Sequence, residues 1–290
     1  MLGIHLHMQW MYGVSECTTW PWPFERDLER YRALGAGAIE MWEFKLATDA
    51  GRRREQVQAA ARQYDVSSFQ ATVHSLFPTH TQPEPSGLQE RRTAFVQTLR
   101  EVAPYIPGAV FVLNTGAASR GDVQAAFDAT VCAYRELVRE ARDAGVLLAL
   151  EPLHPLQMNE DTFAWNLEDA MDVIDAVGDD ALGICADAWN LAGQHDLQSR
   201  LARCGDRIFI AQVSDYRRPR SFLDRLPLGD GSLDLRPFLL GLEAANYRGP
   251  LVFELFSKDV SDSFYDGDME AGIVRTRERL SGLCATVPSA

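Results

Sequence analysis

The chain has 290 residues, of which 46% are hydrophobic and 24% charged, and it carries a formal charge of −13. This composition is typical of a folded globular domain and argues against a disordered chain. No segment approaches the roughly 18 consecutive apolar residues of a membrane helix, and the net negative charge would repel the phosphates of a nucleic acid. We therefore expect a cytoplasmic protein with neither a membrane nor a nucleic-acid partner.

Strand-like and helix-like segments alternate along the whole chain. The predicted strands cover residues 4–10, 38–44, 67–77, 109–116, 146–154, 181–189, 207–215 and 250–256. The helices predicted from apolar spacing of period 3.6 cover residues 25–35, 51–65, 88–106, 122–145, 167–178, 196–205, 235–247 and 269–283. Eight such units in a chain of this length predict an α/β fold, a (β/α)8 TIM barrel in a single domain over residues 1–290. A doubly wound open sheet is the main rival, but it would need a glycine-rich first turn that this sequence lacks.

Four predicted strands in the second half end on an oxygen-bearing side chain. The runs LLALE, LGICAD, IFIAQ and LVFE end on Glu151, Asp187, Gln212 and Glu254. Burying an unpaired carboxylate costs several kcal/mol, so four such ends indicate that they converge on a cation. In a barrel the carboxyl ends of the strands share one mouth. The pattern therefore predicts a divalent metal site.

The ligand atoms indicate which ion is bound. Three carboxylates and one amide form a hard oxygen set, which suits Mn²⁺ or Mg²⁺, whereas Zn²⁺ would normally recruit His or Cys. We expect Mn²⁺ first and Mg²⁺ as the alternative.

Polar residues on the first four predicted strands point to a substrate site at the same mouth. Of His5, His7, Glu40, His74 and Asn114, we favour Glu40 and His74 as residues that hold substrate hydroxyls. A lone strand histidine is more often a core residue.

Three residues near the later strand ends are further candidates. Trp189 could offer a flat surface to a sugar ring, although strand-end aromatic residues are more often core. Arg225, which follows the seventh strand, could grip a phosphate or carboxylate through two parallel hydrogen bonds. His154 lies three residues beyond Glu151 and just outside its strand.

At these positions the chain resembles the xylose isomerase-like TIM-barrel superfamily of sugar phosphate isomerases and epimerases. The similarity is most specific in the blocks LALEPLHP, ICADAWN, QVSDYRRP, LGDGSLDL and GPLVFELF. The resemblance implies that Glu151, Asp187, residue 212 and Glu254 bind a divalent ion, and that the two glutamates also act as acid and base. Barrels of this kind often pair, so a homo-oligomer is compatible with the sequence.

Two positions depart from the pattern of that superfamily. Its seventh-strand ligand is commonly His and is Gln212 here, although some members also use Gln. Its DxxH motif reads Asp187, Ala188, Trp189, Asn190, so that Asn190 stands where a His normally touches substrate oxygens. The second departure leaves the identity of the substrate open.

The resulting hypothesis is a metal-dependent isomerase or epimerase that moves a proton next to the carbonyl of a keto sugar, through an enediolate. Glu151 and Glu254 would remove and return the proton. The alternative is a lyase acting on a keto sugar or keto-cyclitol, with His154 or Glu254 protonating the leaving group. A non-catalytic sugar-binding barrel is the third hypothesis.

Overall fold

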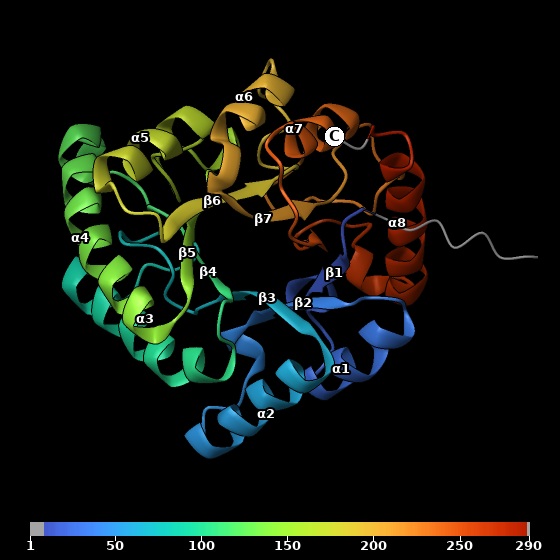
Figure 1. Cartoon of the computed structure of the whole chain (residues 1–290), viewed down its shortest axis with the longest axis horizontal. Helices are drawn as coiled ribbons and strands as arrows, with labels where there is room; N and C mark the ends of the chain where they lie inside the picture. Colours follow the sequence, from blue (N-terminus) through green and yellow to red (C-terminus); the bar gives the residue numbers. More distant parts are fainter. Residues whose placement is uncertain (1–8, 289–290) are drawn as a thin grey trace, which may run out of the picture.

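The computed structural model describes residues 9–288, which form a closed barrel of parallel strands (Figure 1). The strands are β1 (Tyr12–Ser15), β2 (Ala38–Trp42), β3 (Asp65–Gln70), β4 (Val110–Leu113), β5 (Leu147–Leu150), β6 (Leu182–Asp187), β7 (Ile208–Val213) and β8 (Leu251–Phe253). The helices are α1 (Phe24–Ala33), α2 (Ala50–Gln63), α3 (Leu88–Val102), α4 (Val123–Ala144), α5 (Leu167–Val177), α6 (Leu197–Cys204), α7 (Arg236–Ala244) and α8 (Met269–Cys284). The predicted α/β barrel is therefore confirmed.

The first strand lies later in the chain than predicted. The sequence favoured residues 4–10, but β1 is Tyr12–Ser15. Gly13 explains the error, because a glycine weakens a strand pattern. In the barrel, an added Cβ at Gly13 would lie 3.1 Å from the Cβ of Ala38 and 3.2 Å from Cγ2 of Val252, so the close approach of three strands favours a residue without a side chain. His5 and His7 lie outside the described residues.

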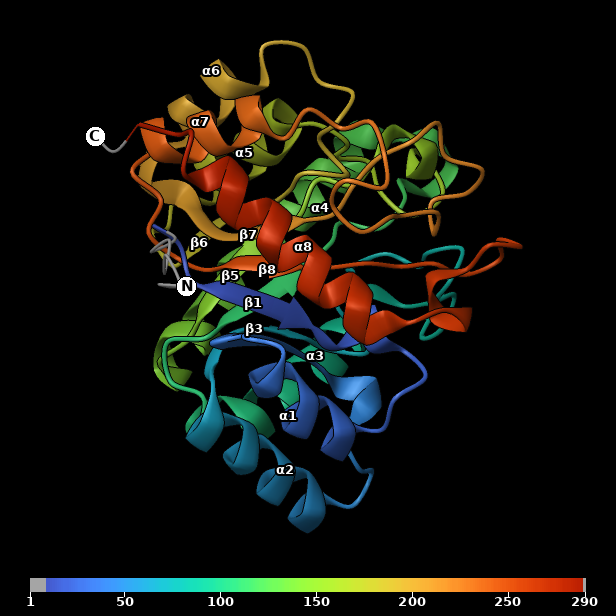
Figure 2. The same cartoon turned by 90° about the vertical axis from the view of Figure 1, so that its right-hand side faces the viewer.

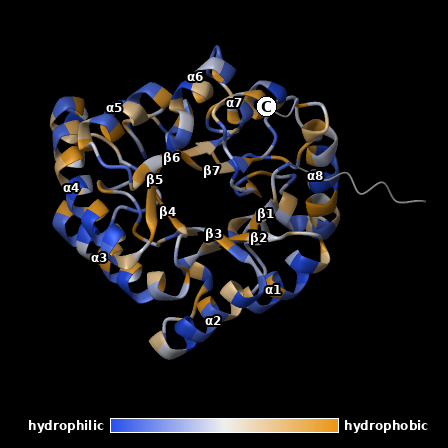
Figure 3. Ribbon diagram, viewed as in Figure 1, coloured by the Kyte–Doolittle hydropathy of each residue, from blue (hydrophilic) through white to orange (hydrophobic). Residues whose placement is uncertain are grey.

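Apolar side chains fill two layers. The barrel interior holds Val110, Val112, Ala149, Cys185, Ile210 and Val252. A larger cluster lies between the strands and the surrounding helices, whose outer faces are mainly hydrophilic (Figure 3). Burial of these apolar faces is the main force that holds such a barrel together. No helix within residues 9–288 combines the length and apolarity needed to cross a membrane.

Long connections gather at the end of the barrel toward which the strands run (Figure 2). They include residues 71–87 after β3, 214–235 after β7 and 254–268 after β8. Because every strand is parallel to its neighbours, residues that follow different strands meet at this mouth.

A buried ion pair links α1 to the segments that follow the first two strands. Nζ of Lys45 donates to Oδ2 of Asp27 at 2.7 Å and to the carbonyl oxygens of Thr19 and Trp22, each at 2.8 Å. The Lys45 side chain is 3% exposed and that of Asp27 is 0% exposed. Lys45 thus ties α1 to the segments that follow β1 and β2.

Replacing Lys45 should destabilise the barrel. We expect Lys45→Met to lower the free energy of unfolding by about 3–5 kcal/mol, because it leaves a buried carboxylate without its cation. Urea denaturation measures this change. Arg142→Met is the control, since Arg142 pairs with Asp179 at the surface and its loss should cost less than about 1 kcal/mol. Equal effects of the two substitutions would contradict the prediction.

Candidate metal centre

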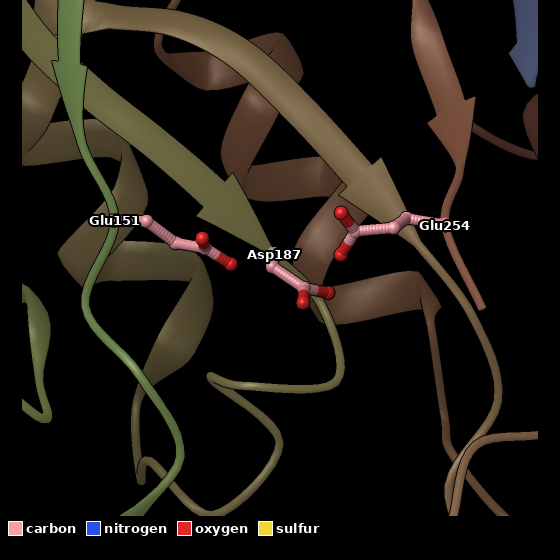
Figure 4. Close-up of side chains that lie close together, drawn as sticks. All are labelled: Glu151, Asp187 and Glu254. Carbon is pink, nitrogen blue, oxygen red and sulfur yellow. The ribbon is translucent and has the colours of Figure 1, made fainter. Parts of the chain in front are cut away.

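Three carboxylates meet at the barrel mouth (Figure 4). Asp187 is the last residue of β6, while Glu151 and Glu254 directly follow β5 and β8. One carboxylate oxygen from each lies within 4.8 Å of the others, and all three residues are buried. The structure thus brings together the three acidic side chains that the sequence placed in one site.

An arginine lies against two of these acids. Nη1 of Arg225 is 2.8 Å from Oδ2 of Asp187 and 2.8 Å from Oε2 of Glu254. The guanidinium lies between two aromatic rings, with its Cζ 5.0 Å from the centre of the Trp189 ring and 5.2 Å from that of Phe256. These rings and the two acids fix the position of a cation that belongs to a loop and not to a strand.

Neutral donors hold the remaining carboxylate oxygens. Nδ2 of Asn190 donates to Oε1 of Glu151 at 2.7 Å, and Nδ2 of Asn114 lies 3.4 Å from Oε2 of the same carboxylate. The backbone N–H of Trp189 donates to Oδ1 of Asp187 at 2.9 Å. Asn190, at the position where the resembled motif has His, therefore contacts an acid of the centre.

The amide of Gln212 presents its nitrogen to the acids. Nε2 lies 3.0 Å from Oε1 of Glu254 and 3.1 and 3.0 Å from the two oxygens of Glu40. The amide oxygen accepts a hydrogen bond from Sγ of Cys185 at 3.0 Å. For Gln212 to bind a metal ion between the acids, its amide would have to turn so that the oxygen faces them. Its role as a ligand stays a prediction.

Burial shifts the protonation of the acids. Desolvation, helped by the nearby charge of Asp187, raises the pKa of Glu151 to about 8. Desolvation also raises the pKa of Asp187, and that of Glu254 well above its usual range, although Arg225 opposes both shifts. These acids and the neighbouring Glu40 outnumber the one arginine that contacts them. The charge imbalance and the hard oxygen donors fit a divalent cation such as Mn²⁺ or Mg²⁺.

His154 packs against Trp189. Its ring centre is 4.5 Å from that of Trp189, and its Nδ1 accepts the backbone N–H of Leu156 at 3.1 Å. Desolvation, with the charge of Arg225, lowers the pKa of His154 to about 4. The ring is therefore neutral near pH 7 with its proton on Nε2, which makes it a hydrogen-bond donor but a poor general acid.

His74 lies on the connection after β3 and packs against Trp42. Its Nδ1 contacts the carbonyl oxygen of Ala71 at 2.8 Å, and its ring meets the edge of Trp42 at 6.1 Å. Burial lowers the pKa of His74. Neither contact involves the carboxylates, so a role in substrate binding stays a prediction.

Two arginines that precede Arg225 on the same loop are already paired with acids. Arg217 and Arg220 both pair with Asp224 and Asp262. Their charges are therefore already balanced by two carboxylates.

The sequence analysis did not single out Cys185. The chain has five cysteines, which show no metal-binding spacing, and Cys185 lies two residues before Asp187 on β6. Because side chains alternate along a strand, a residue at i−2 from a site residue faces the same side of the sheet. That periodicity was the signal that could have found it.

The chain matches the xylose isomerase-like TIM barrel family over residues 28–281. It belongs to that family. The resemblance inferred from the strand-end blocks is thereby confirmed.

One curated relative is the inosose isomerase of Bacillus velezensis, which is 32% identical over 126 residues. That match spans 42% of this chain and 44% of the relative, less than half of either protein.

Two solved structures show the same fold. The IolI protein, solved with a bound zinc atom, superposes with a TM-score of 0.75 at 20% identity, over 97% of this chain and 100% of that one. The D-psicose 3-epimerase of Clostridium cellulolyticum, solved with D-tagatose, gives a TM-score of 0.72 at 13% identity, over 97% and 100%.

The stability of the metal-free protein should depend on pH. Because the pKa of Glu151 is raised from 4.5 to about 8, the folded state binds more protons than the unfolded state between these values. The contribution of Glu151 to stability is therefore greatest at low pH and falls as the pH rises through that window. A divalent ion favours the ionised acids, so it should raise the melting temperature more at pH 8 than at pH 5.5.

Melting curves with EDTA and with added Mn²⁺, Mg²⁺ or Zn²⁺ at the two pH values test this prediction. Asp187→Asn should reduce the rise in melting temperature that the ion causes. An equal rise in the unsubstituted protein at pH 5.5 and pH 8 would contradict the predicted pH dependence.

Proposed function

We propose that the chain is a divalent-metal-dependent isomerase or epimerase of keto sugars. The observation that carries this proposal is the buried cluster of Glu151, Asp187 and Glu254, whose charge exceeds that of the arginine beside it. Membership of the family and the similarity to an inosose isomerase and a D-psicose 3-epimerase support the same class of reaction.

Glu151, Asp187 and Glu254 would hold the metal ion. A bound divalent ion supplies Lewis acidity, which makes the hydrogen next to a substrate carbonyl easier to remove. The oxygen ligands favour Mn²⁺ or Mg²⁺. The zinc in the IolI structure makes Zn²⁺ a third ion to test.

Glu151 and Glu254 would transfer the proton. They follow β5 and β8 and approach Asp187 from opposite sides (Figure 4). One carboxylate would take the proton from carbon and the other would return it, each contributing about 10²- to 10⁴-fold in rate. Asn190 orients Glu151 through one hydrogen bond, and Arg225 orients Glu254 through an ion pair.

Trp189, His154 and Arg225 would contact the substrate. The neutral N–H of His154 can donate to a substrate hydroxyl. The low pKa of this ring argues against the form of the lyase alternative in which His154, and not Glu254, protonates the leaving group. The pairing of Arg217 and Arg220 with aspartates favours a substrate without a phosphate.

Proton exchange in D₂O tests the proposal. The purified protein, loaded with Mn²⁺, is incubated with D-psicose, D-tagatose and a keto-inositol and followed by NMR. Deuterium entering the carbon next to the carbonyl, with formation of an isomer or epimer, is the expected result. Loss of water or of a substituent would identify a lyase. Sugar binding without exchange would identify a binding protein.

Glu254→Gln should abolish most of the activity. We expect kcat to fall by at least about 100-fold, because the amide can neither accept nor return the proton. Metal content must be measured on the same sample by mass spectrometry, so that loss of the ion is not mistaken for loss of the base.

Glu270→Gln is the control, because Glu270 pairs with Arg30 on the outer surface. Retained turnover in Glu254→Gln would remove Glu254 from the proton-transfer step.

A further inference from the structure

Glu40 is a buried carboxylate held by neutral groups. It belongs to β2 and is 0% exposed. Oγ of Ser68 donates to its Oε2 at 2.7 Å, and Nε2 of Gln212 lies within 3.1 Å of both its oxygens. Among residues 9–288, no lysine or arginine forms an ion pair with it. Because burying a polar group costs free energy unless it is hydrogen-bonded, its position calls for an explanation.

The contacts of Gln212 show what Glu40 does. An amide has a donor end and an acceptor end, and the two oxygens of a carboxylate accept hydrogen bonds. Because both oxygens of Glu40 lie within 3.1 Å of Nε2 of Gln212, this contact favours the orientation in which the nitrogen faces Glu40. The thiol of Cys185 donates to the amide oxygen at the other end, which favours the same orientation.

The orientation of the Gln212 amide also affects Glu254. The nitrogen that faces Glu40 also lies 3.0 Å from Oε1 of Glu254, while Arg225 holds Oε2 at 2.8 Å. Each oxygen of Glu254 thus accepts a hydrogen bond, Oε1 from Gln212 and Oε2 from Arg225. If the amide turned, its oxygen would face Oε1 and the carboxylate would lose one of its two supports.

We propose that Glu40 is a positioning residue that fixes the amide of Gln212 and, through it, the carboxylate of Glu254. This inference rests on the proposed role of Glu254 in proton transfer. It differs from the roles expected from the sequence, in which Glu40 binds substrate and Gln212 binds the metal ion. The amide and the hydroxyl already cover both oxygens of Glu40, and no part of the residue is exposed.

Glu40→Gln provides the kinetic test. A glutamine at position 40 keeps the shape of the side chain but no longer requires a donor in front of it. We expect kcat to fall by about 10- to 100-fold, as for other groups that orient the ligands of a metal centre. KM and the dissociation constant for Mn²⁺, measured by titration calorimetry, should stay within about threefold.

A rise in KM with unchanged kcat would overturn the proposal, because Glu40 would then contact the substrate. A dissociation constant for Mn²⁺ raised tenfold or more would also overturn it, because Glu40 would then act on metal binding.

Two further variants act as controls. Glu16→Gln removes another carboxylate that is 0% exposed. Glu16 accepts the backbone N–H of Trp42 and does not contact Gln212, so kcat should not change.

Cys185 tests the other end of the amide. Cys185→Ser keeps a donor to the amide oxygen of Gln212, whereas Cys185→Ala removes it. Serine should retain more of kcat than alanine, and equal losses would contradict the orienting role.

The hydrogen bonds can also be tested without turnover. In metal-free protein, the side-chain N–H₂ signals of Gln212, identified by their loss in Gln212→Leu, should be protected from exchange with solvent. Glu40→Gln should reduce that protection, and Glu16→Gln should not. Unchanged protection in Glu40→Gln would overturn the proposal. This measurement needs neither a sugar nor a metal ion. It therefore tests the role of Glu40 even if the proposed function is wrong.

Discussion

The burial of acidic side chains at the mouth of the barrel is the constraint on which the rest of the site depends. Glu151, Asp187 and Glu254 are withdrawn from water, and the cost of their charges must be met by protons, by donors or by cations. The neighbouring residues can be understood from this requirement. Arg225 supplies one positive charge, while Asn114, Asn190 and Gln212 supply neutral N–H groups.

The acids and Arg225 differ in how firmly the fold holds them. The acids sit at the ends of hydrogen-bonded strands, and Asp187 is paired in register with Gln212 on the next strand. Arg225, in contrast, lies on the connection between β7 and α7 and depends on aromatic contacts for its position. The three acids are thus positioned by the strands of the barrel, whereas the positive charge beside them comes from a loop, as is common for site residues in barrels of this kind.

Most of the barrel could be predicted from the sequence because periodicity and strand length report directly on burial. The strand-terminal position of the three acids was equally visible, since an acid that follows a buried strand has few structural explanations. The first strand was misplaced because Gly13 fits the barrel through the absence of a side chain, which no hydrophobic pattern records. The orientation of the Gln212 amide could not be foreseen either, because it is fixed by Glu40 from a strand 172 residues away in the chain.

The chain order of the acids has a consequence for biosynthesis. Glu151 and Asp187 come from the middle of the chain, but Glu254 follows β8, which pairs with β1 to close the barrel. A nascent chain on the ribosome therefore carries at most two of the three acids of the centre in place until its last strand has emerged and docked. The third acid therefore reaches the centre only with the strand that closes the barrel.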